Sequence, residues 1–235
     1  MTKMGQWGNE AMGQYENHSR LAPRAHFRIA PLPHCLIASL LAVAACTSGP
    51  PPPDQRPYEQ QIASARARKD ADFRAADDSP IPVAARAAFA GLPYFAVDPA
   101  YRVPAHVTEN RKGPPIVITL QTSTSVPRKM RTVGILGFSI GGAEYTLTAF
   151  ADEDASTLDR LFVPFGDLTN GAETYKAGRY LDLERTPTGL YDLDFNRAYH
   201  PYCVYNPKYE CPIPPKENRL QVAISAGERL KVPGS

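Results

Sequence analysis

The chain has 235 residues, of which 43% are hydrophobic, and it carries 26 Lys and Arg against 24 Asp and Glu. This length predicts one domain with extensions. The small basic surplus comes from the first 45 residues, so the residues from Cys46 onward are formally neutral, with 22 charges of each sign. Because no Lys or Arg cluster stands out, the composition excludes a nucleic-acid partner.

Residues 1–45 are predicted to be a signal peptide. Three arginines, Arg20, Arg24 and Arg28, precede an uninterrupted apolar run of eleven residues, 35–45. Such a run matches the apolar part of a signal peptide and is well short of the roughly 20 residues that span a bilayer. It ends in VAAC, which resembles a bacterial lipobox whose cysteine, Cys46, becomes lipidated. The alternative is a plain secretory signal followed by an incidental cysteine.

A lipidated Cys46 would attach the protein to a membrane and place it in the cell envelope. The next residue, Thr47, is not the aspartate of inner-membrane retention signals, so we expect the periplasmic face of the outer membrane in a cell with two membranes. Residues 46–56 include four consecutive prolines and predict an extended tether, because proline runs favour polyproline II. Residues 57–235 are then predicted to form a single β-rich domain.

The domain is predicted to start with one helix and continue as strands. Apolar residues recur at helical spacing over Arg56–Ala76, and Asp78-Ser79-Pro80 ends the pattern. A short helical turn over Val83–Phe89 is a second expectation. From there the apolar period changes to two, which predicts eight short strands: Tyr101–Val107, Ile116–Thr122, Thr132–Ile140, Ala143–Phe150, Leu161–Phe165, Arg179–Leu183, Tyr191–Phe195 and Leu220–Ser225.

The fold class predicted from these elements is mainly β. Gly141-Gly142 between two alternating runs indicates a two-residue hairpin. No alternation of strands and helices follows, which argues against a parallel sheet. We therefore expect an antiparallel sandwich or barrel-like domain with an N-terminal helix and a long loop rich in Pro, Tyr and Cys. This loop, Asp194–Arg219, is called the clasp segment below.

The five prolines of the clasp segment exclude a helix and a regular strand there. A long loop dense in polar and aromatic residues is either functional or a structural closure. We expect its polar side chains, with those of the Asp167–Arg179 loop, either to line a binding site or to form an internal ion-pair network that holds the loop. The candidate residues are Tyr175, Arg179, Asp194, Asn196, Arg197, Tyr199, Glu217 and Asn218.

Cys203 and Cys211 also lie in the clasp segment. In an oxidising envelope, two cysteines eight positions apart predict a disulfide, with free thiols as the alternative. A metal site that uses His200, Cys203 and Cys211, together with Asp194, is a further alternative, although paired Cys-x-x-Cys spacing is missing.

Residues 137–141, GFSIG, match the G-x-S-x-G pattern of a nucleophile elbow. That motif requires a strand, a sharp turn and then a helix, so that the serine is exposed. Here the pattern after Gly142 continues as a strand, so Ser139 is interpreted as an ordinary strand residue. No catalytic residue and no cofactor can be named from the sequence, and an enzymatic role stays uncertain and disfavoured.

Three segments make the chain resemble the domain-of-unknown-function 1684 family: DLTNGAETYKAGRYLDL (Asp167–Leu183), DFNRAYHPYCVYNPKYECPIPPKENRL (Asp194–Leu220) and AGE (Ala226–Glu228). The resemblance covers about Tyr58 to Glu228. It implies bacterial and archaeal relatives without an established activity, some of them lipoproteins. The family pattern usually has asparagine at the position of His200, which speaks against a catalytic or ligand role for this histidine.

Two hypotheses follow from the sequence. The first is a lipid-anchored β-domain that binds a small ligand or an envelope protein without catalysis. The second is an enzyme or cofactor-binding protein whose site lies where the Asp167–Arg179 loop meets the clasp segment. A pocket in which Arg179, Arg197 and Glu217 converge favours the second hypothesis, and a closed, salt-bridged clasp favours the first.

Overall fold

The described part of the chain comprises residues 54–109, 116–124, 126–186, 188 and 190–230 of a computed structural model. The predicted signal peptide, Cys46 and most of the tether lie outside these residues. From Arg56 onward the chain forms its own compact unit. None of the described helices is both long enough and apolar enough to cross a membrane.

The described residues build a seven-stranded sheet in the order β6-β5-β4-β3-β1-β7, with β2 also paired to β3. Every strand pair is antiparallel. A bridge between Arg185 and Tyr191 joins the ends of β6 and β7, so the sheet nearly closes into a barrel. This confirms the predicted fold class. The strands are β1 Arg102–Glu109, β2 Ile116–Leu120, β3 Arg128–Ile140, β4 Ala143–Asp152, β5 Arg160–Phe165, β6 Arg179–Glu184 and β7 Tyr191–Asp194.

The long strand β3 is the centre of the sheet. Its first residues pair with β2 and its later residues with β1, and a bulge between Thr132 and Gly134 separates the two registers. A bulge bends a strand and increases its twist, which helps a sheet to curve. At the end of β3 the predicted hairpin is confirmed: Gly141 and Gly142 have φ of 59° and 80°, as a type I′ turn requires.

The barrel interior is apolar. Leu136, Leu147, Leu161, Leu181 and Leu193 come from five different strands, and each is at most 1% exposed. Burial of one such side chain stabilises the fold by about 1.5–3 kcal/mol. They belong to one core cluster that also contains Phe138, Phe165 and Phe195.

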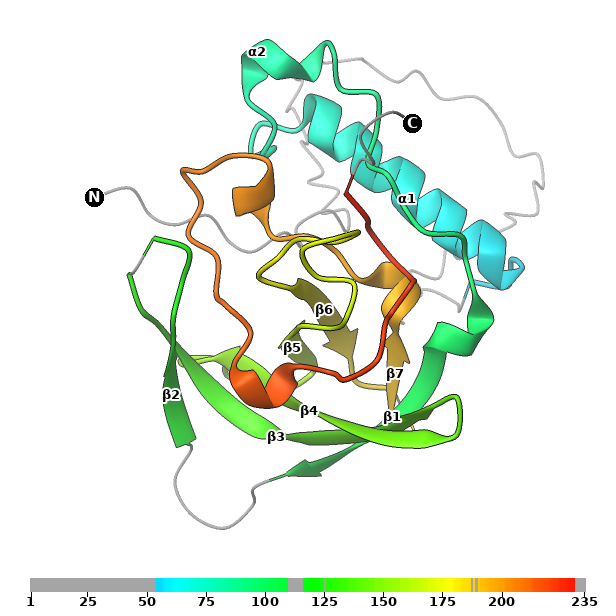
Figure 1. Ribbon diagram of the computed structural model, residues 1–235, viewed down its shortest axis with the longest axis vertical. Helices are drawn as coiled ribbons and strands as arrows, with labels where there is room; N and C mark the ends of the chain where they lie inside the picture. Colours follow the sequence, from blue (N-terminus) through cyan, green and yellow to red (C-terminus); the bar gives the residue numbers. More distant parts are fainter. Residues whose placement is uncertain (1–53, 110–115, 125, 187, 189, 231–235) are drawn as a thin grey trace, which may run out of the picture. The chain divides into compact units, whose positions relative to one another are not determined.

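Helix α1, Tyr58–Ala75, packs outside the barrel. Pro57 precedes it, and at its C-terminal end Ala76 turns to an extended ψ of 146°. Ile62 and Phe73 are its buried residues, which fits the thin apolar stripe of the sequence. A four-residue helix, α2 (Val83–Arg86), follows within the predicted helical turn. The clasp segment is followed by residues 220–230, which are called the tail below. Figure 1 shows the clasp segment and the tail, orange to red, running between α1 and the strands β3 and β4.

The predicted strand Leu220–Ser225 is wrong. This stretch runs beside the loop after β5: the Leu220 amide donates to Gly166 O at 2.8 Å, and the Leu168 amide donates to Val222 O at 3.1 Å. Further along, the carbonyl of Ile224 accepts a hydrogen bond from the Arg179 side chain at 2.7 Å. The Arg179 side chain therefore occupies a position at which a neighbouring strand would pair. The period-two pattern of apolar residues does not reveal such a contact.

Candidate functional site

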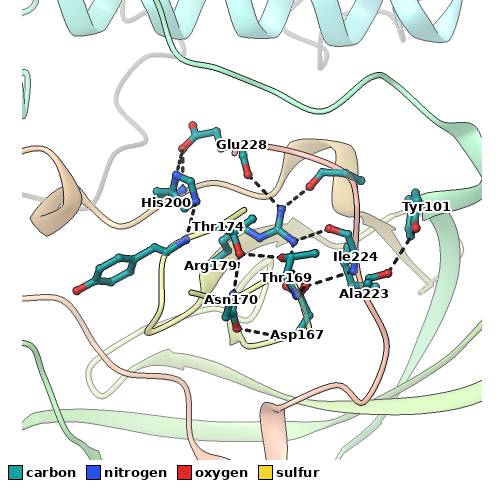
Figure 2. Close-up of polar contacts among 12 residues, drawn as sticks. Tyr101, Asp167, Thr169, Asn170, Thr174, Arg179, His200, Ala223, Ile224 and Glu228 are labelled. Carbon is teal, nitrogen blue, oxygen red and sulfur yellow. Dashed lines mark hydrogen bonds and ion pairs between the residues drawn. The ribbon is translucent and has the colours of Figure 1, made fainter. Parts of the chain in front are cut away.

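Arg179, at the start of β6, is fully buried, which is costly for a cation unless it is paired and hydrogen-bonded. Its Nη2 donates to Asp167 Oδ2 at 2.9 Å and to the Ile224 carbonyl at 2.7 Å. Its Nη1 donates to the carbonyls of Ala226 and, at 3.2 Å, Glu228. Figure 2 shows this guanidinium among these acceptors. Arg179 thus binds the C-terminal tail of its own chain.

Asp167 connects Arg179 to the loop after β5. Its Oδ1 accepts hydrogen bonds from Thr169 N at 2.8 Å, from Thr169 Oγ1 at 2.6 Å and from Ile224 N at 3.3 Å. The Thr169 hydroxyl also lies 2.8 Å from the Thr174 hydroxyl. Both side chains of the Arg179–Asp167 ion pair are fully buried. The pair therefore joins β6, the 167–174 loop and the tail within the protein interior.

A second charged cluster surrounds Glu228, which is 1% exposed. Lys69 Nζ of α1 lies 2.7 Å from Glu228 Oε1. The His200 amide and the Tyr205 hydroxyl donate to Oε2 at 2.7 and 2.9 Å. Burial alone would raise the pKa of Glu228, but the charge of Lys69, the nearby His200 and the hydrogen bonds from Lys69 and the His200 amide lower it below its usual value. Glu228 is therefore a buried carboxylate that ties α1 to the clasp segment.

His200 lies beside this carboxylate as a neutral imidazole. Burial lowers its pKa to about 4, although Glu228 acts in the opposite direction. Its Nε2 accepts a hydrogen bond from the Tyr175 amide at 3.2 Å, and its Nδ1 lies 3.7 Å from Glu228 Oε2. The imidazole thus links the two loops that were predicted to meet.

The predicted residues Asp194 and Asn196 form a third network. Asp194 is buried and accepts from the Tyr58 hydroxyl at 2.7 Å, the Asn196 amide at 3.0 Å and Arg197 Nε at 3.1 Å. The Asn196 side chain bonds both backbone groups of Asp98, at 2.8 and 3.0 Å. Arg197 is 48% exposed. This network attaches the first turn of α1 to the clasp segment.

The remaining predicted residues, Tyr199, Glu217 and Asn218, do not meet at one site. Asn218 is buried against Thr148, and the Tyr199 hydroxyl donates to Asp182 at 2.8 Å. Glu217 is exposed, in a 3-10 turn next to Asn218, and does not approach Arg179. Arg179, Arg197 and Glu217 therefore do not converge on one pocket.

Cys203 and Cys211 lie next to each other, and both are free thiols in the structure. The Cys203 amide donates to Cys211 Sγ at 3.2 Å. The predicted disulfide is thus not formed, although the clasp segment brings the two residues together. Across the described ranges, no group of three or more His, Cys, Asp and Glu side chains is arranged to hold a metal ion.

Ser139 lies in β3, opposite Glu144 of the hairpin, and its side chain is exposed. The strand continues to Ile140, and β4 follows directly after the turn. A nucleophile elbow needs a helix at this point. The interpretation of Ser139 as an ordinary strand residue is therefore confirmed.

Sequence reasoning missed the residues that hold these networks together: Lys69, Asp98, Asp167, Thr169 and Glu228. Two of the segments that resemble the family, Asp167–Leu183 and Ala226–Glu228, contain three of these residues and carried a usable signal. Gly227 has a φ of +78°, and a Cβ there would lie 2.5 Å from Ala198 O and 2.7 Å from Phe195 O. The close approach of the tail to the clasp segment therefore requires a glycine at this position.

The barrel and its internally paired clasp define a small β-domain closed by its own C-terminal tail. The model of the family "Protein of unknown function (DUF1684)" matches residues 87–229. The chain belongs to this family. It is also similar to an uncharacterized protein of Haloarcula marismortui whose solution NMR structure is known, with 38% identity and a TM-score of 0.58 over 74% of this chain and 94% of that one. None of the curated proteins matches the chain.

Proposed function

We propose that this protein is a bacterial lipoprotein, held on the cell envelope by a lipid on Cys46, whose β-domain binds a small ligand. Support for the anchor comes from the lipobox-like sequence VAAC after an apolar run of eleven residues. The family and the Haloarcula protein carry no stated activity. The binding role therefore rests on the geometry of the domain.

One observation carries the binding proposal. Among the described residues, four buried donor atoms have no hydrogen-bond partner: Arg179 Nε, within the ion pair with Asp167, and a group of three, Arg66 Nε, Arg66 Nη2 and the Tyr94 hydroxyl. The three donors of Arg66 and Tyr94 lie together, because the Arg66 guanidinium stacks over the Tyr94 ring at 4.4 Å. Buried donors are normally hydrogen-bonded, and leaving one unpaired costs about 1–3 kcal/mol. An acceptor-bearing ligand, such as a carboxylate, would satisfy all three.

A binding role fits the other charged groups better than catalysis does. Arg179, Asp194 and Glu228 all bond to the protein itself and are at most 2% exposed. A general base must reach a proton on its substrate, so residues held in this way are poor candidates. The clasp segment is then a structural closure that fixes α1 over the barrel.

The ligand proposal is tested by native mass spectrometry of full-length protein purified from its own envelope. We expect a retained small molecule on the wild type and its loss from Tyr94→Phe. Because this change also removes an unpaired hydroxyl, the ligand-free variant should be about 1 kcal/mol more stable than ligand-free wild type. Equal ligand retention would place the site elsewhere. Destabilisation of the ligand-free variant would mean that the hydroxyl has a partner within the protein.

The anchor is tested separately by palmitate labelling. Cys46→Ser should abolish incorporation and release the protein from membranes, whereas Cys35→Ser, within the apolar run, should leave labelling intact. Equal labelling of Cys46→Ser and wild type would refute lipidation at Cys46.

A further inference from the structure

The two cysteines of the clasp segment have unequal surroundings. Cys211 is buried, and both of its backbone groups are held: its amide donates to Ser123 Oγ at 3.1 Å, and its carbonyl accepts from the Ser123 amide at 3.0 Å. Cys203 lies on the short 3-10 turn Tyr202–Val204 and is partly exposed. Cys211 is thus held in the interior, whereas Cys203 is partly exposed.

Hydrogen bonds favour the thiolate of Cys203. A hydrogen bond with Cys211 is the main cause that lowers the pKa of Cys203 to about 7, and the Ser123 and Tyr175 hydroxyls act in the same direction against burial. The same Cys203–Cys211 contact and burial raise the pKa of Cys211. Tyr180 is the other titratable group near the pair, and its hydroxyl donates to Pro212 O. At neutral pH Cys203 is therefore partly ionised to the thiolate, beside a Cys211 thiol that stays protonated.

We propose that Cys203 and Cys211 form a redox-active pair, in which Cys203 reacts with peroxide and Cys211 resolves the product as a disulfide. The partial exposure of Cys203 admits a small oxidant more readily than a bulky protein disulfide. The pair is independent of the ligand site near Arg66 and of lipidation at Cys46.

The chemistry balances in two steps. The Cys203 thiolate attacks one oxygen of the peroxide, the O–O bond breaks, and the other oxygen leaves as an alkoxide or hydroxide that takes a proton from water. Cys203 becomes a sulfenic acid, oxidised by two electrons. Cys211 then attacks that sulfur, the S–O bond breaks, and the departing hydroxide takes the Cys211 proton to form water. A dithiol reductant restores both thiols by exchange.

The test uses reduced, full-length protein and peptide mapping, so that Cys35 and Cys46 are read separately. Iodoacetamide should alkylate Cys203 of the folded protein with a midpoint near pH 7 and leave Cys211 unmodified. At pH 7 the larger thiolate fraction outweighs the lower nucleophilicity, so Cys203 should react about threefold faster than an ordinary thiol. Tyr175→Phe removes one donor to Cys203, so it should raise the midpoint without preventing the disulfide.

One equivalent of hydrogen peroxide should convert the wild type to a Cys203–Cys211 disulfide that dithiothreitol reduces in the folded protein. In Cys211→Ser the sulfenic acid should persist and form a dimedone adduct at Cys203, whereas Cys203→Ser should give no adduct. Equal alkylation of both cysteines, no disulfide after peroxide, or a disulfide that resists reduction until the protein unfolds would each overturn the proposal. If Cys211→Ser does not fold, the alkylation, disulfide formation and reduction of the wild type still test the proposal.

Discussion

The side-chain amide of Asn218 pairs with the backbone of Thr148 on β4 as a neighbouring strand would. Its Oδ1 accepts from the Thr148 amide at 2.7 Å, and its Nδ2 donates to the Thr148 carbonyl at 2.8 Å. The same Nδ2 donates to Pro164 O of β5 at 2.8 Å. Strands β4 and β5 share only the register pair Phe150–Phe162, so Asn218 joins them where their own ladder is incomplete.

Asn218→Asp is expected to destabilise the domain by roughly 2–4 kcal/mol, because a carboxylate cannot donate to either carbonyl and is costly to bury. Urea unfolding measures the change. The matched control is Asn206→Asp, since Asn206 uses its Oδ1 only to accept from Lys208 N, at 3.2 Å, and aspartate keeps that acceptor. Equal stability of Asn218→Asp and wild type would contradict the strand-like role of Asn218.

Gly227→Ala should destabilise the domain more than Gly141→Ala does. Both glycines have positive φ, which costs an alanine roughly 1–2 kcal/mol. At Gly227 the added Cβ also meets Ala198 O at 2.5 Å, whereas at Gly141 nothing lies within 4 Å. Because both variants share the cost of positive φ, the difference between their midpoints of thermal unfolding measures the destabilisation caused by the steric contact at position 227. A smaller effect at position 227 would show that the tail can shift away from the clasp segment.

Arg179→Lys should cost roughly 3 kcal/mol. A single ammonium cannot reach Asp167 and three carbonyls at once, so buried acceptors lose their donors. Arg160→Lys is the control, because Arg160 is 46% exposed and pairs with Glu184 at 3.5 Å, an arrangement of little energetic value. Chemical denaturation of the three proteins gives the comparison. A change at Arg179 no larger than that at Arg160 would contradict the tail-binding role.

The domain should lose stability as the pH falls below neutrality. The unfolded chain protonates His200 near its ordinary pKa of 6.5, while burial keeps the folded imidazole neutral down to about pH 4. Between these values the unfolded state takes up a proton that the folded state does not. The free energy of unfolding should therefore fall by up to about 3 kcal/mol from pH 6.5 to pH 4. Glu228, whose pKa is lowered in the fold, adds to the loss as the pH falls further.

His200→Asn should flatten this dependence, and His106→Asn, at an exposed position, should leave it unchanged. Urea denaturation at several pH values gives the curves. If the curves of His200→Asn and wild type run parallel, the buried histidine is not the source of the pH dependence.

Local sequence signals predicted most of the fold. The hairpin could be predicted because its two determinants depend on neighbouring residues alone: the Gly141-Gly142 turn and the alternating burial along β3 and β4. The polar networks of the candidate site could be predicted only in part. Asp194 and Asn196 meet in one turn, whereas the partners of Glu228 come from α1 and the clasp segment. Such pairs depend on tertiary packing, which no spacing in one sequence encodes.

The position of the tail has a consequence for synthesis. Arg179 and Lys69 are made long before Ile224, Ala226 and Glu228, the residues that satisfy their charges. Without these residues, Arg179 keeps Asp167 but loses its three carbonyl acceptors, and Lys69 of α1 loses its ion pair with Glu228. The bonds that join β6, α1 and the clasp segment to the tail can therefore form only after residues 224–228 have been made. Chains that lack residues 224–228 are therefore expected to be cleaved by proteases faster than chains that contain them.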